Sequence, residues 1–139
     1  MKDIFTQKVT IYNDVAEDGV NARRFDRHVI DKCLVYSETI ELADGTIQRV
    51  AGSQNVITKD IERYKSPTEY AELPADQKPN YYTAQIDDFV VLGDVDDVVT
   101  TSKEFQALQQ KYAKNGFSVT GVNASLYGMS VDNIHIMHS

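Results

Sequence analysis

The chain has 139 residues, of which 14 are Lys or Arg and 21 are Asp or Glu, so its formal net charge is −7. The length predicts one domain, residues 1–139, and the acidic balance argues against free DNA, RNA or an anionic membrane as ligands, because these bind clustered Lys and Arg. Cys33 is the single cysteine, which excludes an intrachain disulfide, and no apolar run reaches the roughly 18 residues that a membrane helix needs. We therefore expect a protein that is made and kept in a reducing cytosol.

The first part of the chain predicts two β-hairpins. The stretch "QKVTIYND" alternates between apolar and polar residues, and Asp18-Gly19 is a strong turn signal before "RRFDRHVIDKCLVYS", which reads as one long or two shorter strands. A second turn at residues 43–46, "ADGT", separates two further alternating stretches. We expect a second, protruding hairpin there, with Gly52 and Ser53 interrupting its return strand as a bulge or loop.

The segment "SPTEYAELPADQKPN" at residues 66–80 contains all three prolines and loses the strand pattern. Pro67 suits the first turn of a short helix, with Ser66 as its N-cap and Glu69 as the reciprocal partner. Pro74 and Pro79 prevent any extension of that helix. We predict one helical turn followed by a fixed loop, after which strands resume at once in "YYTAQIDDFVVLGDV".

One longer helix is predicted in "TSKEFQALQQKYAKNG", residues 101–116. Thr101 and Glu104 have the spacing of a capping box, and Asn115-Gly116 makes an ordinary C-terminal stop. The apolar stripe has the spacing i, i+3, i+7 and consists of Phe105, Leu108 and Tyr112. We expect this stripe to pack on a sheet or on a neighbouring subunit.

The end of the chain, "FSVTGVNASLYGMSVDNIHIMHS", predicts two strands joined near "NASLYG", the last of them close to an edge of the sheet. Short strands joined by tight turns are typical of antiparallel sheets. The predicted fold class is therefore mainly β: a small antiparallel β-barrel or sandwich with an extended hairpin and one to two inserted short helices.

The stretch "IDDFVVLGDVDDVV", residues 86–99, places aspartates on both sides of a β-branched run. A calcium loop needs a central glycine and a final bidentate carboxylate, and neither falls in register here. Aspartates are common at strand ends and turns, where water reaches their side chains. We interpret these residues as solvated carboxylates on an acidic rim or lumen, and not as a metal or catalytic site. They are Asp87, Asp88, Asp94, Asp96 and Asp97.

Other residue types that carry chemistry form no recognisable site. His135 and His138 point to opposite faces of a predicted strand, which makes them a poor chelate. His28 has no partner evident in the sequence, and Cys33 is most simply a small buried hydrophobe. The sequence contains no phosphate-binding loop, no G-x-S-x-G and no H-E-x-x-H. We therefore predict no enzyme activity, no cofactor and no metal.

Four stretches of the chain form a recognisable combination: "KVTIYN", "RRFDRHVID", "DDFVVLGDVDD" and "FSVTGVNASLYGMSVDNIHIMH". Together they resemble the minor capsid or head-tail connector proteins encoded among the morphogenesis genes of tailed phages and prophages of Gram-positive bacteria. The shared features are "TIYN" at residues 10–13, a D…V-x-G strand at residues 88–93, and a terminal strand pair. In that pair the matching residues are Val122, Asn123, Tyr127, Gly128 and His135. Residues 36–65 are the least similar part.

The resemblance implies a head-closure (stopper) protein, a small β-barrel subunit of a homo-oligomeric ring. Its partners would be the portal or adaptor on one side and tail proteins on the other, and DNA would pass through the ring without sequence-specific binding. The implied location is the head-tail interface of the virion, after synthesis in the cytoplasm of the bacterial host, with no membrane contact. A tail terminator or tail completion protein is the alternative, and a small cytosolic binding module is a third possibility.

A ring subunit needs extended hairpins that reach its neighbours. The hairpin around Asp44-Gly45 is our candidate for such a contact. The candidate interface residues for the ring or its partners are Tyr36, Glu38, Ile40, Asp44, Gly45, Ile47 and Arg49.

Overall fold

The structure is a computed structural model that describes residues 5–16, 23–38, 53–127 and 130–138 of the chain. Its strands form one 7-stranded sheet in the order β5-β4-β1-β2-β3-β7-β6, and every pair of neighbours is antiparallel. The strands are β1 (Gln7–Ala16), β2 (Arg23–Glu38), β3 (Ser53–Thr58), β4 (Phe89–Leu92), β5 (Gly116–Ser118), β6 (Gly121–Tyr127) and β7 (Ser130–His138). The helices are α1 (Pro67–Glu72), the 3-10 turn η1 (Lys78–Asn80) and α2 (Ser102–Lys111). The mainly β fold with two short helices confirms the predicted class.

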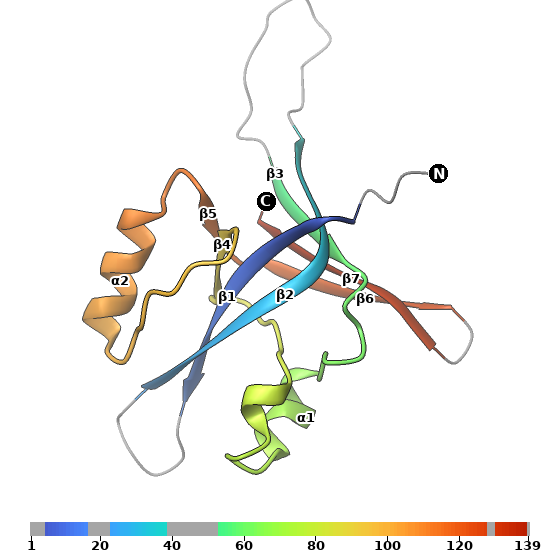
Figure 1. Ribbon diagram of the computed structural model, residues 1–139, viewed down its shortest axis with the longest axis horizontal. Coiled ribbons are helices and arrows are strands. Elements are labelled where there is room, and N and C mark those ends of the chain that lie inside the picture. Colours follow the sequence, from blue (N-terminus) through green and yellow to red (C-terminus); the bar gives the residue numbers. More distant parts are fainter. Residues whose placement is uncertain (1–4, 17–22, 39–52, 128–129, 139) are drawn as a thin grey trace, which may run out of the picture.

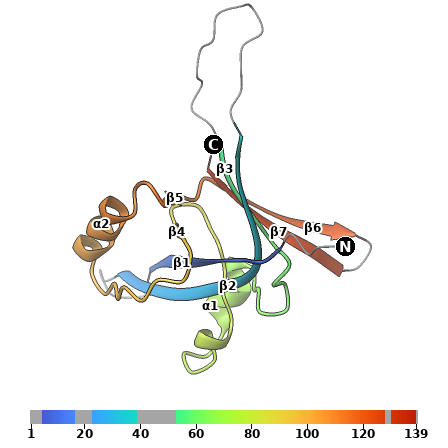
Figure 2. The same ribbon diagram turned by 45° about the horizontal axis from the view of Figure 1, so that its top comes forward.

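The sheet curls back on itself, so that β1 and β2 cross one side of the molecule and β3, β6 and β7 cross the other (Figures 1 and 2). Its two outermost strands, β5 and β6, follow each other in the chain with only Val119 and Thr120 between them. The Val119 amide donates to the Asp88 carbonyl at 2.8 Å, while the Thr120 amide donates to the Met137 carbonyl at 2.8 Å. These two consecutive residues thus bind residues near opposite margins of the sheet. The fold is therefore barrel-like, although β5 and β6 do not pair with each other to close the sheet.

Strand β2 is one continuous strand that bends at a corner. Its first part pairs with β1 and its last part, from Cys33 to Glu38, pairs with β3. The register against β1 shifts between Gln7 and Val9, opposite a Lys32 whose φ is 54°. Such a bulge bends a strand and lets one strand serve two parts of a curved sheet.

Both predicted hairpins are confirmed as strand pairs. Strands β1 and β2 pair as far as Ala16 and Arg23, and β2 and β3 pair as far as Glu38 and Ser53. The predicted turn at residues 43–46 and the predicted irregularity at Gly52 lie outside the described residues, whereas Ser53 begins β3.

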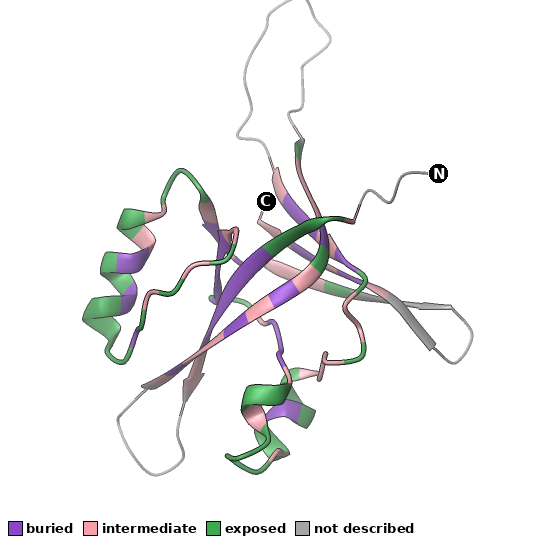
Figure 3. Cartoon of the chain, in the orientation of Figure 1, coloured by how far each residue is buried: buried purple, intermediate pink, exposed green. Residues whose placement is uncertain are grey.

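Two hydrophobic clusters lie on opposite faces of the β1–β2–β4 half of the sheet, because neighbouring residues of β1 and β4 belong to different clusters. Figure 3 shows that these strands and α2 contain buried residues. The inner cluster fills the curve of the sheet and includes Val9, Ile11, Ile30, Val56, Val90, Ile134 and Ile136. The outer cluster joins the opposite face to α2 and consists of Tyr12, Phe25, Phe89, Val91, Val99, Phe105 and Leu108. The rings of Phe25 and Phe105 stack with centroids 4.7 Å apart. The predicted stripe of α2 therefore packs on the sheet of the same chain.

Both helix starts follow the sequence prediction. In α1, Pro67 is the first residue, and Ser66 and Glu69 form the expected capping box. In α2, the Thr101 side chain accepts from the Glu104 amide. These caps satisfy amides that the first turn of a helix leaves without an intrahelical partner.

Two boundaries differ from the prediction. Helix α2 ends at Lys111, and Gly116, the expected stop, instead begins β5. A Cβ at Gly116 would lie 2.6 Å from the Val90 carbonyl oxygen, so the close approach of β5 to β4 explains this glycine. The strand expected from Tyr81 begins only at Phe89. The preceding residues turn inward to cover one end of the sheet, where Tyr82 and Ala84 are buried.

We expect Gly116→Ala to destabilise the protein by about 1–3 kcal/mol, because the new methyl group would overlap a backbone carbonyl that cannot move without disturbing β4. Urea denaturation of both proteins measures this difference. The control is Gly121→Ala, whose Cβ would meet only the flexible Met137 side chain at 3.2 Å. Equal losses in the two variants would contradict the close-approach explanation.

Candidate functional site

The predicted acidic residues do not converge on one site. Arg27 donates to Asp94 at 3.1 Å and to Asp96 at 3.5 Å, both at exposed positions. Lys111 of α2 donates to Asp97 at 2.7 Å, an interaction that lowers the pKa of the Asp97 carboxyl. The exposed Asp94 and Asp96 agree with the interpretation as surface carboxylates. Asp97 has a different role, since it links the loop before α2 to the last turn of that helix.

Asp88 contradicts the prediction of a solvated carboxylate, because it is completely buried. Its carboxylate accepts from the Asn13 side chain at 2.7 Å, from the Asp14 amide at 3.0 Å and from the Gln85 amide at 2.9 Å. Burial nevertheless raises the pKa of Asp88 to about 7, against the lowering effect of these donors. The adjacent Asp87 is exposed and has a φ of 78°, so the sharp turn there directs one carboxylate outward and the next inward.

The candidate interface residues are only partly described. Tyr36 lies on β2 and its ring is stacked on His135 of β7, with centroids 6.3 Å apart. Glu38 is the last residue of β2 and pairs with Ser53. The other candidates lie outside the described residues; they are Ile40, Asp44, Gly45, Ile47 and Arg49.

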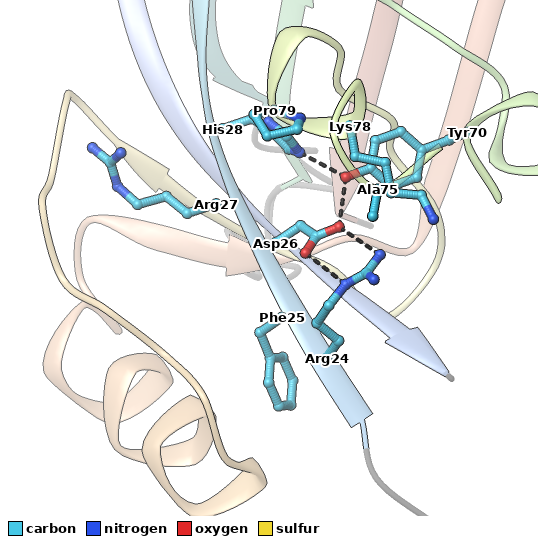
Figure 4. Close-up of a pocket in the computed structure, with 9 residues that line it drawn as sticks. All are labelled: Arg24, Phe25, Asp26, Arg27, His28, Tyr70, Ala75, Lys78 and Pro79. Atoms are coloured by element: carbon cyan, nitrogen blue, oxygen red, sulfur yellow. Dashed lines mark hydrogen bonds and ion pairs between the residues drawn. The ribbon is translucent and has the colours of Figure 1, made fainter. Parts of the chain in front are cut away.

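A cavity of about 370 Å³ lies between β2 and the segment that contains α1 and η1. Figure 4 shows the nine residues that line it: Arg24, Phe25, Asp26, Arg27, His28, Tyr70, Ala75, Lys78 and Pro79. Alternation along β2 separates their side chains, since Arg24, Asp26 and His28 point toward α1 while Phe25 and Arg27 point away (Figure 4). The cavity wall on the β2 side is therefore polar.

Three of these side chains form a hydrogen-bonded chain. The Tyr70 hydroxyl donates to Asp26 at 2.5 Å and lies 3.0 Å from Nε2 of His28. Since a tyrosine hydroxyl has one hydrogen and Asp26 receives it, Nε2 of His28 must be the donor in the second bond. Asp26 also accepts from Nε of Arg24 at 2.9 Å. A neutral His28 therefore leaves its Nδ1 as an acceptor.

Burial determines the protonation of this chain. Burial lowers the pKa of His28 to about 4, although the nearby Asp26 opposes that shift. Burial and the hydrogen bond to Asp26 raise the pKa of Tyr70, so its hydroxyl stays protonated at neutral pH. Lys78 lies over the Tyr70 ring, 5.7 Å from its centroid. The cavity thus combines two neutral groups, His28 and Tyr70, with the ion pair of Asp26 and Arg24 and the cation of Lys78, and could hold a small polar group.

The sequence did not indicate this site. His28 and Tyr70 are separated by a long stretch of chain, and neither belongs to a motif that predicts their contact. The capping signals of α1 predicted the helix but not the face that it turns toward β2. Cys33, predicted to be a buried hydrophobe, is confirmed as such, and burial raises the pKa of its thiol to about 11.

Two further features concern metals and membranes. Among the described residues, no group of three or more His, Cys, Asp or Glu side chains is arranged to hold a metal ion. Within that same part of the chain, neither helix has the length and apolar character needed to span a membrane.

A model of one protein family, the family of unknown function DUF6751, matches residues 4–138. The chain belongs to this family. The matched range includes every strand, both helices and all residues that line the cavity. No curated protein and no solved structure matches the chain.

We expect NMR titration of the His28 ring to give a pKa of about 4 in the folded protein and a value near 6.5 in urea, where the burial is lost. A depressed histidine pKa means that the stabilisation is complete above the unfolded value of 6.5 and is lost as the pH falls toward 4. The difference corresponds to roughly 3 kcal/mol. A folded-state pKa near 6.5 would contradict the buried, neutral assignment.

We expect Asp88→Asn to reduce the free energy of unfolding at pH 8 by about 1–3 kcal/mol. Only one amide oxygen can accept, so the amide nitrogen of the new side chain would face a backbone donor from Asp14 or Gln85. Urea denaturation measures the loss. The matched control is Asp87→Asn, an exposed position where we expect a change within about 0.5 kcal/mol. Similar midpoints for the two variants would refute the buried role of Asp88.

Proposed function

We propose that this protein is a structural subunit of a tailed-phage or prophage virion, a head-closure or head-tail connector protein that acts as a homo-oligomeric ring. The first support is the sequence resemblance described above, whose motifs fall on the strands that build the sheet. "TIYN" lies in β1, where Thr10 to Asn13 are all buried, and the D…V-x-G motif covers β4. The resemblance therefore rests on residues that determine the fold.

The observation that carries the proposal is that several strand pairs extend beyond the body of the sheet. Strand β2 has 16 residues, against about 5–6 in an ordinary strand. Strand β3 pairs with β7 only from Ile134 to His138, while β6 pairs with β7 as far as Ser130. A two-stranded ribbon is only marginally stable alone in water, so these extensions suit contacts with other subunits.

The distribution of charge is compatible with a channel through which DNA passes. A net charge of −7 repels phosphate and does not retain nucleic acid. Of the five aspartates proposed for an acidic lumen or rim, Asp87, Asp94 and Asp96 are exposed and suit that role, whereas Asp88 is buried. The partners that we propose are the portal or adaptor and the tail proteins, and the proposed location is the virion head-tail interface.

A second candidate function is a small cytosolic binding module. The observation that favours it is the cavity between β2 and α1, where Arg24 and Lys78 accompany the chain of Asp26, Tyr70 and His28. A structural role is sufficient to explain the presence of the same groups, because their hydrogen bonds attach α1 to β2.

We expect deletion of the gene from its phage or prophage to give tails of normal length, separated from heads that have lost their DNA. Electron microscopy of lysates measures this directly, and a plasmid copy of the gene should restore joined particles. DNA-filled heads beside tails of abnormal length would instead favour the tail-terminator alternative. Normal infectious particles would overturn the virion proposal.

A further inference from the structure

Strand β6 is a sheet edge without the usual protection against pairing. Among the described residues, β6 forms a ladder only with β7. The register is regular from Gly121 to Ser125, and the first irregularity comes between Ser125 and Leu126. The sequence of β6, GVNASLY, contains no charged residue and no proline. Natural edge strands are ordinarily blocked by charges, prolines or bulges, and the stretch from Gly121 to Ser125 has none of these, so no described residue prevents another strand from pairing with it.

An apolar hollow lies beside this edge. Its volume is about 400 Å³, and it is lined by Tyr64, Pro67, Ala84, Gln85, Ile86 and Val122. Val122 belongs to β6, while Ala84 to Ile86 belong to the segment before β4. Ile86 is 63% exposed and lines this hollow, so it offers an apolar surface to a strand added beside it. A strand added to β6 would place alternate side chains over this hollow.

We propose that β6 accepts a strand from a second copy of this chain and that residues 39–52 of that copy supply it. This inference rests on the proposed homo-oligomeric ring, and it identifies the surface through which neighbouring subunits join. Main-chain hydrogen bonds along β6 provide the pairing, and the hollow around Ile86 receives apolar side chains.

The sequence of residues 39–52, TIELADGTIQRVAG, supports this occupant. Ile40 and Leu42 alternate with polar residues, and Ile47 has a polar residue on each side. The segment lies between Glu38 and Ser53, which form the last described pair of the β2–β3 ladder. The regular stretch of β6, Gly121 to Ser125, has five residues and is roughly 17 Å long. Either half of residues 39–52 is long enough to pair with all of it.

The proposed contact is heterologous, because the donor segment and the acceptor strand are different parts of the chain. Each copy then donates one strand and accepts another, and such a contact generates a ring when its rotation closes. Pairing of β6 with β6 would instead be a two-fold contact and would give a dimer. The two arrangements are therefore distinguishable by cross-linking.

The first test uses two single-substitution proteins, Asn123→Cys on the exposed part of β6 and Gln48→Cys in the donor segment. Cys33 stays in place because it is buried, and the unsubstituted protein is the control for its reactivity. The two variants are mixed, refolded together and treated with a short bismaleimide. We expect mixed dimers to exceed either homodimer at least tenfold by mass spectrometry. Predominant Asn123→Cys homodimers, or no cross-link above the control, would overturn the proposal.

The second test compares assembly of the full chain by mass photometry. We expect Ile86→Ser and Asn123→Lys to weaken self-association at least tenfold, since one removes an apolar contact and the other places a charge on the edge. The matched control is Val98→Ser, because Val98 is 75% exposed but lines a different hollow, beside α2. Urea midpoints confirm that each variant is folded.

The outcomes separate this inference from the proposed function. If all variants form the same oligomer as the wild-type chain, the β6 edge is not the interface and the ring proposal stands. If the wild-type chain remains monomeric at every concentration tested, the homo-oligomeric ring and the edge contact both fail. In that case the lysates of the deletion strain still decide whether the protein acts in the virion.

Discussion

The fold depends on one segment of chain that serves both margins of the sheet. Strands β5 and β6 lie within residues 116–127, and the sheet curls because the first of them must pair with β4 while the second pairs with β7. Asp88 is central to this junction. Its carbonyl accepts from Val119 at the margin, and its buried carboxylate holds Asn13 and Asp14 at the end of β1. Asp88 thus connects the segment before β4 to β1 and to the residue that follows β5.

Two buried titratable groups at this end of the sheet respond to pH in opposite directions. Burial favours neutral His28, so its contribution to stability is present above pH 6.5 and is lost as the pH falls toward 4. Burial favours protonated Asp88, so its contribution is present below its unfolded pKa near 4 and is lost as the pH rises toward 7. Between about pH 4 and pH 6.5, the stability that His28 loses as the pH falls is offset by the stability that Asp88 gains. The fold can therefore carry two buried titratable groups with little net pH dependence from the pair.

Local signals in the sequence predicted local structure well. The caps at Ser66 and Thr101, the alternation of β1 and the apolar stripe of α2 each depend on residues within one or two turns of each other, and the structure confirms them. The predictions that failed depend on distant partners. Asp88 looks like its exposed neighbours in sequence, and only the approach of β1 makes it buried. Gly116 resembles a helix stop, but its small size is needed because Val90 lies against it.

The same distinction explains why the cavity could not be predicted. His28 and Tyr70 meet because α1 is folded back over the end of the sheet. The segment between them includes the rest of β2 and all of β3, which pair with each other and with β1 and β7. A single sequence contains no local pattern for such a contact. For β6, the sequence shows that the strand has no charged residue and no proline, but only the structure shows that the strand lies at the margin of the sheet.

The strand order connects this architecture to assembly. The hydrogen bonds of Val119 and Thr120 fix the connection between β5 and β6 to both margins of the sheet, but β6 itself has only β7 beside it among the described residues. A complete barrel would need β4 to continue alongside β6, and it does not, because the chain before Phe89 turns inward as Tyr82 and Ala84 enter the core. The residues that complete the inner core therefore leave the outer edge open. In a ring, a neighbouring copy can supply the strand that this chain directs into its own interior.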